Sequence, residues 1–230
     1  MNGQIENLSI SGLQDQYAGL QYFGAMSASI AHEIKNALAI TNENAGLMED
    51  LSLMAIKSGQ SLEPERIARL AKKVMDQIKR ADNIVKKMSQ FAHSVDEPVK
   101  VVNLSEVTEL ALELGRRSAA SFSITLGPVK CDGSFSIQTN PFILMNLLWL
   151  LIKSAFRRVN SDKTIEVVVS KEGSKVSIAI LNLLKNQLDS EQDKAQNDQI
   201  AKLADLLNAD VYMNNTDKIV INIMQNNKLK

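Results

Sequence analysis

The segment SIAHEIKNALA, residues 29–39, places a histidine, a glutamate, a lysine and an asparagine within five consecutive positions. Imidazole is largely neutral near pH 7, so a ring nitrogen of His32 has a free lone pair that can attack phosphorus. An adjacent carboxylate such as Glu33 can hold one ring N–H and stabilise the imidazolium that develops. The amide of Asn36, four residues on, can contact phosphoryl oxygens or position a water. These residue types suit phosphoryl transfer, although a short string of this kind also recurs by chance in exposed helices.

Two long helices are expected to carry these residues. No proline interrupts Leu13 to Ser58, and apolar or small residues recur there with a 3,4 spacing. Gly59 and Pro64 mark a break, after which a second helix is expected from Pro64 to about Val95. The seam of the first helix comprises Leu20, Phe23, Ser27, Ile30, Ile34, Ala37 and Thr41, with Leu38, Ala45 and Met48 beside it. The seam of the second comprises Ile67, Leu70, Val74, Ala81, Ile84, Met88, Phe91 and Val95. On this pattern His32 points away from the core.

The two helices predict an antiparallel hairpin over residues 1–95 that forms a dimeric four-helix bundle. Each helix has an apolar stripe that is too wide for a single neighbour to cover. Two hairpins that pack together bury both stripes, so a homodimer is expected.

The sequence pattern changes after SVDEP at residues 94–98, from long helical periodicity to short strand-like and helix-like segments. Residues 96–230 are therefore expected to form an α/β sandwich. An extended start is expected at 99–104, and a polar, mobile loop at 185–198. Helices are expected at 105–119, 141–159 and 199–208, with strands at 122–126, 134–138, 164–170, 175–181, 210–214 and 218–224. The fold class is therefore α plus α/β in two domains.

Composition narrows the function classes. Lysine plus arginine equals aspartate plus glutamate, which gives no hint of nucleic acid or a membrane surface as partner. The lone Cys131 has no disulfide or metal-site partner, which fits a reducing, cytoplasmic setting without a bound metal. The longest apolar run, residues 142–152, is shorter than the about 20 residues that cross a bilayer, so it predicts a buried helix. Trp149 and the methionines lie on apolar faces and are expected in the core.

Three segments in order resemble the core of bacterial sensor histidine kinases. SASIAHEIKNALA closely resembles their phosphoacceptor box, IKRADNIVKKMSQFAHSVDEPV the second helix of their dimerisation domain, and VVNLSEVTELAL the beginning of their ATP-binding domain. The resemblance runs from about residue 20 to the end of the chain and implies that His32 is the phosphoacceptor. It also implies a docking surface for a receiver domain on the flank of the hairpin, which includes Lys35, Asn36, Ala39, Ile40, Glu43 and the start of the second helix. The family usually has proline where this chain has Ala37, which puts the local helix kink in doubt.

The second domain resembles the ATP-binding domain of that family in pattern but departs from it in chemistry. Leu150 and Ser154 stand where its helix is expected to carry asparagines, Asn182 stands at the aspartate position and Leu184 at a glycine position. No glycine occurs after Gly173, and the segment 185–198 carries four carboxylates, which would repel a triphosphate. We expect this domain to keep its fold without binding ATP.

The resemblance as a whole implies a histidine phosphotransferase, which moves a phosphoryl group between receiver-domain aspartates through His32 without ATP. No cofactor is expected on this chain, and the partner receiver is expected to bring Mg²⁺. Expected partners are response regulator receiver domains, with a hybrid sensor kinase as a further candidate. Two alternatives stay open: a pseudokinase scaffold that binds a kinase or regulator without chemistry, and a receiver phosphatase in which Asn36 orients water.

Overall fold

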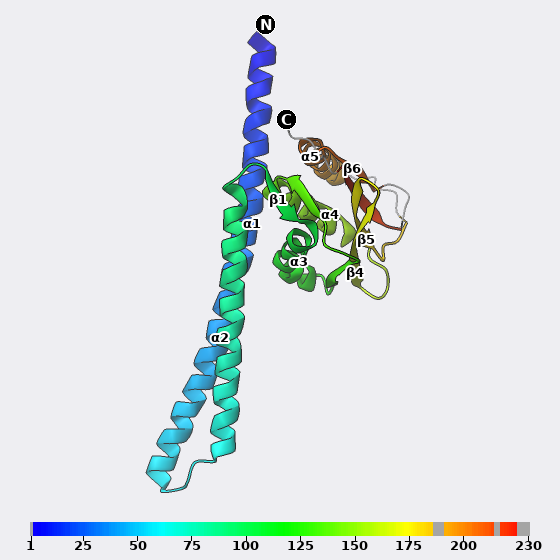
Figure 1. Cartoon of the computed structure of the whole chain (residues 1–230). Coiled ribbons are helices and arrows are strands. Elements are labelled where there is room, and N and C mark those ends of the chain that lie inside the picture. Colours follow the sequence, from blue (N-terminus) through cyan, green and yellow to red (C-terminus); the bar gives the residue numbers. More distant parts are fainter. Residues whose placement is uncertain (1, 186–190, 214–216, 225–230) are drawn as a thin grey trace. The chain divides into compact units, whose positions relative to one another are not determined.

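The computed structural model describes residues 2–185, 191–213 and 217–224, and it divides into two compact units. One unit is Phe23–Ala92, and the other combines Met1–Tyr22 with His93–Lys230. The long helix α1, Asn2–Ser58, contributes to both units (Figure 1). Each unit is described by itself.

The first unit is an antiparallel hairpin, as the 3,4 spacing predicted. After α1 the chain turns at Gly59, whose φ of +66° suits the residue that follows a helix, and α2 runs over Pro64–Ala92 (Figure 1). The rings of Phe23 and Phe91 stack with centroids 5.2 Å apart, which sets the register of the two helices. The buried side chains of α1 in this unit are spaced by four or seven residues, and those of α2 by seven or fourteen. They are Met26, Ile30, Ala37 and Asn44 from α1, and Leu70, Ile84 and Phe91 from α2.

Some details of the predicted helices are corrected. α1 begins at Asn2 rather than Leu13, and α2 ends at Ala92, followed by a 3₁₀ turn, η1, over His93–Val95. The side chains of Leu20, Leu38, Ala45, Met88 and Val95 were placed on or beside the seams but are exposed in the single chain. Buried methionines are found at positions 26 and 145, so the expectation of core methionines is wrong for those exposed at 54, 75, 88 and 224. Met is unbranched and flexible, so it is tolerated on both kinds of surface.

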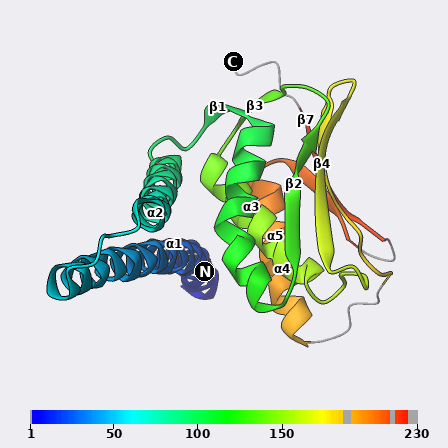
Figure 2. The same ribbon diagram turned by 90° about the horizontal axis from the view of Figure 1, so that it is seen from below.

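The second unit is an α/β layer, in agreement with the predicted fold class. Its five-stranded sheet has the order β2-β4-β5-β7-β6, and β1 pairs with β3 in a separate two-stranded sheet. β2 and β4 are parallel, and the other pairs in both sheets are antiparallel. The strands are β1 Lys100–Asn103, β2 Thr125–Cys131, β3 Ser136–Thr139, β4 Thr164–Glu172, β5 Lys175–Leu181, β6 Ala209–Tyr212 and β7 Ile219–Met224. The helices are α3 Leu104–Ser121, α4 Pro141–Ala155 and α5 Glu191–Leu206, and they cover one face of the sheet (Figure 2).

The core lies between this sheet and its helices. Alternate residues of the central strands are buried, as the period of two requires: Ile165, Val167 and Val169 of β4, Val176, Ile178 and Ile180 of β5, and Ile219, Ile221 and Ile223 of β7. The opposing wall is α4, whose apolar sequence is buried on nearly every side. Asn140 caps this helix by accepting a hydrogen bond from the Ile143 N–H at 3.0 Å, and Pro141 occupies the first turn.

Several predicted boundaries in this unit are wrong. The strand expected at 122–126 lies at Thr125–Cys131, and the helix expected to reach Val159 ends at Ala155. The polar segment 185–198 was predicted as a loop, but residues 191–198 form the first turns of α5, because Glu, Gln, Lys and Ala are all good helix formers. The rest of that segment beyond residue 185, and residue 214 of an expected strand, lie outside the described residues. No helix in the described ranges is long and apolar enough to cross a membrane.

Candidate functional site

His32 lies on the exposed side of α1. Ile30 and Ala37 are buried in the hairpin, and a residue two positions after Ile30 is rotated by about 200° around the helix. The His32 side chain is accordingly exposed, and the three residues before it are small or apolar: Ser29, Ile30 and Ala31. Within the described ranges the ring makes no hydrogen bond or ion pair, so either nitrogen is accessible to an incoming group.

Glu33 and Asn36, the two residues predicted to assist His32, differ in their exposure to solvent. Glu33 is half-buried, and in the described part of the chain its carboxylate has no hydrogen bond to the His32 ring, so its role in holding the ring stays a prediction. Asn36 is exposed one helical turn beyond His32, within reach of the same ligand. Ala37 is fully buried, and α1 continues through it, with the Thr41 hydroxyl donating to the Ala37 carbonyl at 2.9 Å.

The predicted docking residues lie beside this site. Lys35, Ala39 and Glu43 are exposed, and Ile40 leaves 36% of its surface to solvent. His32, Asn36 and Ile40 follow one another at intervals of four residues, so they form a ladder along one side of α1. This ladder ends at Asn44, whose buried amide donates to the Ile40 carbonyl at 2.7 Å. The structure therefore brings together the predicted phosphoacceptor, the predicted water-positioning amide and the apolar residue of the docking surface.

The positions expected to have lost ATP chemistry lie in the second unit. On α4 the Leu150 carbonyl accepts a hydrogen bond from Gln196 Nε2 of α5 at 2.8 Å, and the Ser154 hydroxyl donates to the Leu151 carbonyl at 2.7 Å. Gln196 belongs to the polar stretch that was predicted as a loop. The α5 helix thus packs directly on the helix where a nucleotide site was sought, and it does so with a specific hydrogen bond.

The chain that leaves β5 is attached to the segment after α4. Asn182 has a φ of +67°, and its carbonyl accepts from the Asn160 N–H at 3.1 Å. The next residue, Leu183, is buried and forms an isolated bridge with Val159, and the Leu184 N–H donates to the Arg158 carbonyl. Asn182 and Leu184, the two remaining degenerate positions, therefore lie in a backbone connection.

Arg158 is a residue of this region that the sequence did not single out. Its side chain is 1% exposed, and it donates from Nε to the Leu184 carbonyl at 3.3 Å and from Nη1 to the Met213 carbonyl at 3.0 Å. Burial lowers the pKa of this guanidinium. One feature of the sequence hinted at this residue, a pair of arginines at the end of an apolar helix. Such a pair is also typical of a solvent-exposed helix end, so it did not indicate a buried guanidinium.

Asn146 of α4 was also missed. It is 3% exposed, and its Oδ1 has no hydrogen-bond partner among the described residues. It precedes Leu150 by four residues, so both lie on the same side of α4. The sequence feature that could have identified Asn146 is its polar amide in the middle of the apolar run FILMNLLWLL. In the described ranges, no group of three or more His, Cys, Asp and Glu residues can hold a metal ion.

Solved structures similar to this chain include histidine kinases and a catalytic domain or cytoplasmic segment of such kinases. The histidine kinase AdeS of Acinetobacter baumannii is 14% identical over 85% of this chain and 98% of its own, with a TM-score of 0.46. The cytoplasmic segment of the histidine kinase QseC is 13% identical over 64% of this chain and 95% of its own, with a TM-score of 0.45. The catalytic domain of the histidine kinase ThkA is 12% identical over 56% of this chain and 97% of its own, with a TM-score of 0.47. No protein-family model and no curated protein matches the chain.

Proposed function

We propose that this chain is a histidine phosphotransferase of a two-component phosphorelay. The observation that carries the proposal is an exposed, unengaged His32 on a helical hairpin, one turn before the exposed amide of Asn36. Imidazole at such a position can accept a phosphoryl group from a second protein. The expected donors and acceptors are the phosphorylated aspartates of receiver domains.

In the proposed transfer step, one bond to phosphorus forms and one breaks. The lone pair of one His32 ring nitrogen attacks the phosphorus in line, and the bond from phosphorus to the carboxylate oxygen of the partner breaks. The aspartate leaves as a carboxylate, and the proton on the other ring nitrogen stays there or is held by a carboxylate such as Glu33. The reverse step delivers the group to a second receiver. Mg²⁺ from the receiver neutralises the transferring oxygens.

The same proposal includes the absence of ATP-dependent kinase activity. Two contacts support it: the Gln196 hydrogen bond to Leu150, and the buried Arg158 that joins the backbone after β5 to the end of β6. The positions 150, 154, 182 and 184 offer no carboxylate for a metal–triphosphate complex. A nucleotide would have to displace these contacts before it could bind.

A homodimer is also part of the proposal. The exposed side chains Leu38 and Ala45 of α1 each follow a buried hairpin residue by one position, and so does Val85 of α2. Ile78 of α2 likewise follows the half-buried Gln77. Because the two helices are antiparallel and face each other, equal offsets place both rows on the same side of the hairpin. We call this side the apolar flank, with Leu38, Ala45, Ile78 and Val85 as its members. A second hairpin packed on it would complete a four-helix bundle.

The proposal is tested by determining whether ATP or a phosphorylated receiver domain can phosphorylate the chain. The purified wild-type chain is incubated with γ-labelled ATP alone, or with each member of a panel of pre-labelled phosphorylated receiver domains. We expect label only from a receiver, with none from ATP at millimolar concentration. Label from ATP alone would show a kinase and contradict the loss of the nucleotide site. Transfer from no receiver of the panel would favour a scaffold that binds its partners without chemistry.

Asn36 favours receiver dephosphorylation as a second candidate function, since its exposed amide can orient a water near the phosphorus. An Asn36→Ala variant is expected to slow phosphate release from a phosphorylated receiver by about 100-fold, because a mispositioned nucleophile costs that order of rate. Phosphoryl transfer to His32 should change by less than about threefold in the same variant. The matched control is Asn42→Ala, an exposed amide on another side of α1. If Asn36→Ala slows phosphoryl transfer to His32 as much as it slows phosphate release, Asn36 assists the transfer step and not hydrolysis alone.

A further inference from the structure

A groove of about 410 Å³ lies between α5 and β6 in the second unit. The two elements are side by side (Figure 1), and they are connected in a sharp turn by the buried Leu207 and by Asn208, whose φ is +49°. The walls of the groove are hollow because they carry short side chains, those of Ala201 and Ala204 on α5 and of Ala209 on β6. None of the residues assigned to phosphoryl transfer or to the degenerate nucleotide site lines this groove.

The groove runs along the free edge of the sheet. β6 is the last strand in the order β2-β4-β5-β7-β6, and in the described ranges it pairs with β7 alone. Successive strand residues point to opposite faces, so a cavity that touches all of the residues 209–213 borders an edge of the strand, and β7 occupies the other edge. At a free edge, alternate residues present unpaired N–H and C=O groups, although the Met213 carbonyl here accepts from Arg158. The hollow therefore lies next to a template for strand pairing.

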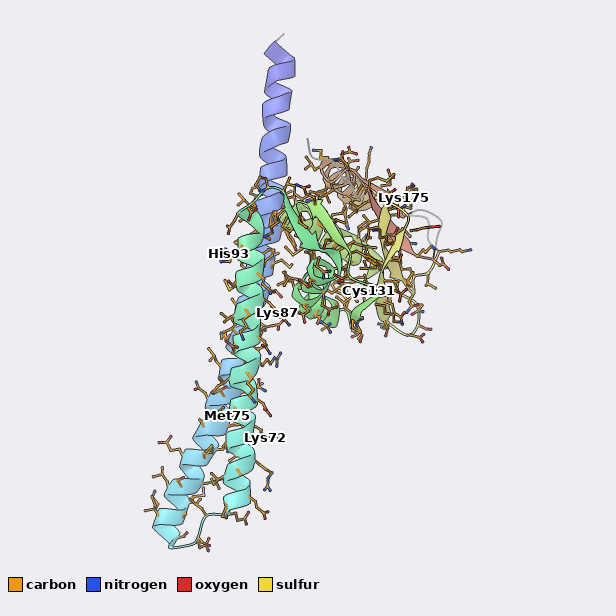
Figure 3. All side chains as sticks on the ribbon, in the orientation of Figure 1. Lys72, Met75, Lys87, His93, Cys131 and Lys175 are labelled. Carbon is orange, nitrogen blue, oxygen red and sulfur yellow. The ribbon has the colours of Figure 1, made fainter. Side chains whose placement is uncertain are left out.

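The charged residues of the groove are all acidic. Asp205 of α5 and Asp210 of β6 line it, both are exposed, and neither carboxylate forms an ion pair in the described part of the chain. No lysine or arginine is among the lining residues. Lys175, labelled in Figure 3, lies opposite Met224 of β7, one row beyond the beginning of β6. A positively charged occupant is therefore favoured over a neutral or acidic one.

We propose that this groove binds an extended, basic segment of another protein, which adds to β6 as a further strand of the sheet. Main-chain hydrogen bonds to the free edge hold the segment, and small apolar side chains at alternate positions enter the hollow over Ala201 and Ala204. Lysine or arginine side chains beside them face Asp205 and Asp210. Tyr212, which is 55% exposed in the same groove, offers its ring to one of these cations. The inference does not rest on the proposed phosphotransfer, and it gives the degenerate domain a binding role.

Other occupants fit the groove less well. Nucleic acids and anionic lipid headgroups are repelled by two carboxylates that no lining cation offsets. A metal ion lacks ligands, since the described residues contain no group of three or more His, Cys, Asp and Glu that could hold one. A second copy that paired through its own β6 would bring further carboxylates to the same edge, because that strand also carries Asp210. A basic strand from a different protein meets none of these obstacles.

The test measures the binding of synthetic peptides to the full chain. The probes are fluorescent ten-residue peptides in which valine alternates with lysine, with glutamate or with serine, and their binding is followed by anisotropy at low and high salt. Asp205→Asn/Asp210→Asn removes the charge of the groove, and Asp132→Asn/Glu172→Gln removes the same charge from two exposed carboxylates outside it. Ala201→Phe fills the hollow, and Ala195→Phe makes the same change at an exposed position of α5 that does not line the groove. Circular dichroism verifies the fold of each variant.

We expect the lysine–valine peptide to bind at least about tenfold more tightly than the glutamate–valine peptide, and most strongly at low salt. Asp205→Asn/Asp210→Asn should remove most of this preference, and Ala201→Phe should weaken binding at least about tenfold, whereas each control changes it by less than about threefold. Binding should also slow amide hydrogen exchange in residues 209–213, because a paired strand protects the edge. N-methylation of one alternate set of peptide residues should abolish binding, and N-methylation of the other set should not.

Three results would overturn the inference. The first is no binding of any probe at millimolar concentration, or equal binding of the lysine and glutamate peptides. The second is an equal effect of Ala201→Phe and Ala195→Phe, or binding without slower exchange in residues 209–213. The third is protection of β6 that rises with protein concentration in the absence of peptide, since a second copy would then occupy the edge. A His32→Gln variant should bind the peptides like wild type, so failure of the phosphotransfer and failure of this site are read separately.

Discussion

A His32→Gln variant is expected to take no label from any phosphorylated receiver that labels the wild-type chain. The loss should be at least about 10³-fold, because glutamine keeps a polar side chain of similar length but has no nucleophilic ring nitrogen. His32 is exposed and without a hydrogen bond in the described residues, so the substitution should leave the unfolding free energy within about 0.5 kcal/mol of wild type. Labelled protein is quantified after denaturing electrophoresis, and loss of the label in acid identifies phosphohistidine.

The chain provides its own control for this experiment. It contains two histidines, and the second, His93, is exposed and contacts the Asp96 carboxylate through Nδ1 at 2.7 Å. His93→Gln should be labelled like wild type. Label that persists on His32→Gln would move the acceptor elsewhere and refute the proposed site. If His32→Gln loses label but keeps its full effect on signalling in cells, the scaffold alternative is supported.

An Arg158→Met variant is expected to lose about 3 kcal/mol of unfolding free energy. Methionine can replace the apolar stem of the buried side chain, but the carbonyls of Leu184 and Met213 then lose their charged donors in two part-buried hydrogen bonds. Each unsatisfied buried polar group costs about 1–3 kcal/mol. Trp149 is the only tryptophan and is 8% exposed on α4, so its fluorescence during urea unfolding reports on this unit.

The neighbouring Arg157 supplies the matched comparison. Its side chain is exposed, and surface interactions of arginine contribute about 0–1 kcal/mol, so Arg157→Met should be nearly neutral. Equal unfolding midpoints for the two variants would show that the buried guanidinium does not stabilise the unit. Arg158→Met has a second use, since it removes the connection between the backbone after β5 and residue 213. If the variant remains folded and then binds ATP, Arg158 contributes to the loss of the nucleotide site.

Much of the fold could be predicted because it follows from local periodicity. β5 was predicted with its observed bounds, since a strict alternation of apolar residues leaves one choice of face. The buried helix α4 followed from a long apolar run that is too short to cross a bilayer. The first turns of α5 were missed, because a charged segment without a clear apolar stripe fits a loop or a helix equally well until its contacts are known.

The sequence by itself determined the hairpin, the exposure of His32 and the side of α1 shared with Asn36 and Ile40. These features depend on residues three, four or seven positions apart, and that spacing is set by the geometry of one helix. Only the tertiary structure decided that Arg158 would reach the carbonyls of Leu184 and Met213, which are 26 and 55 residues away.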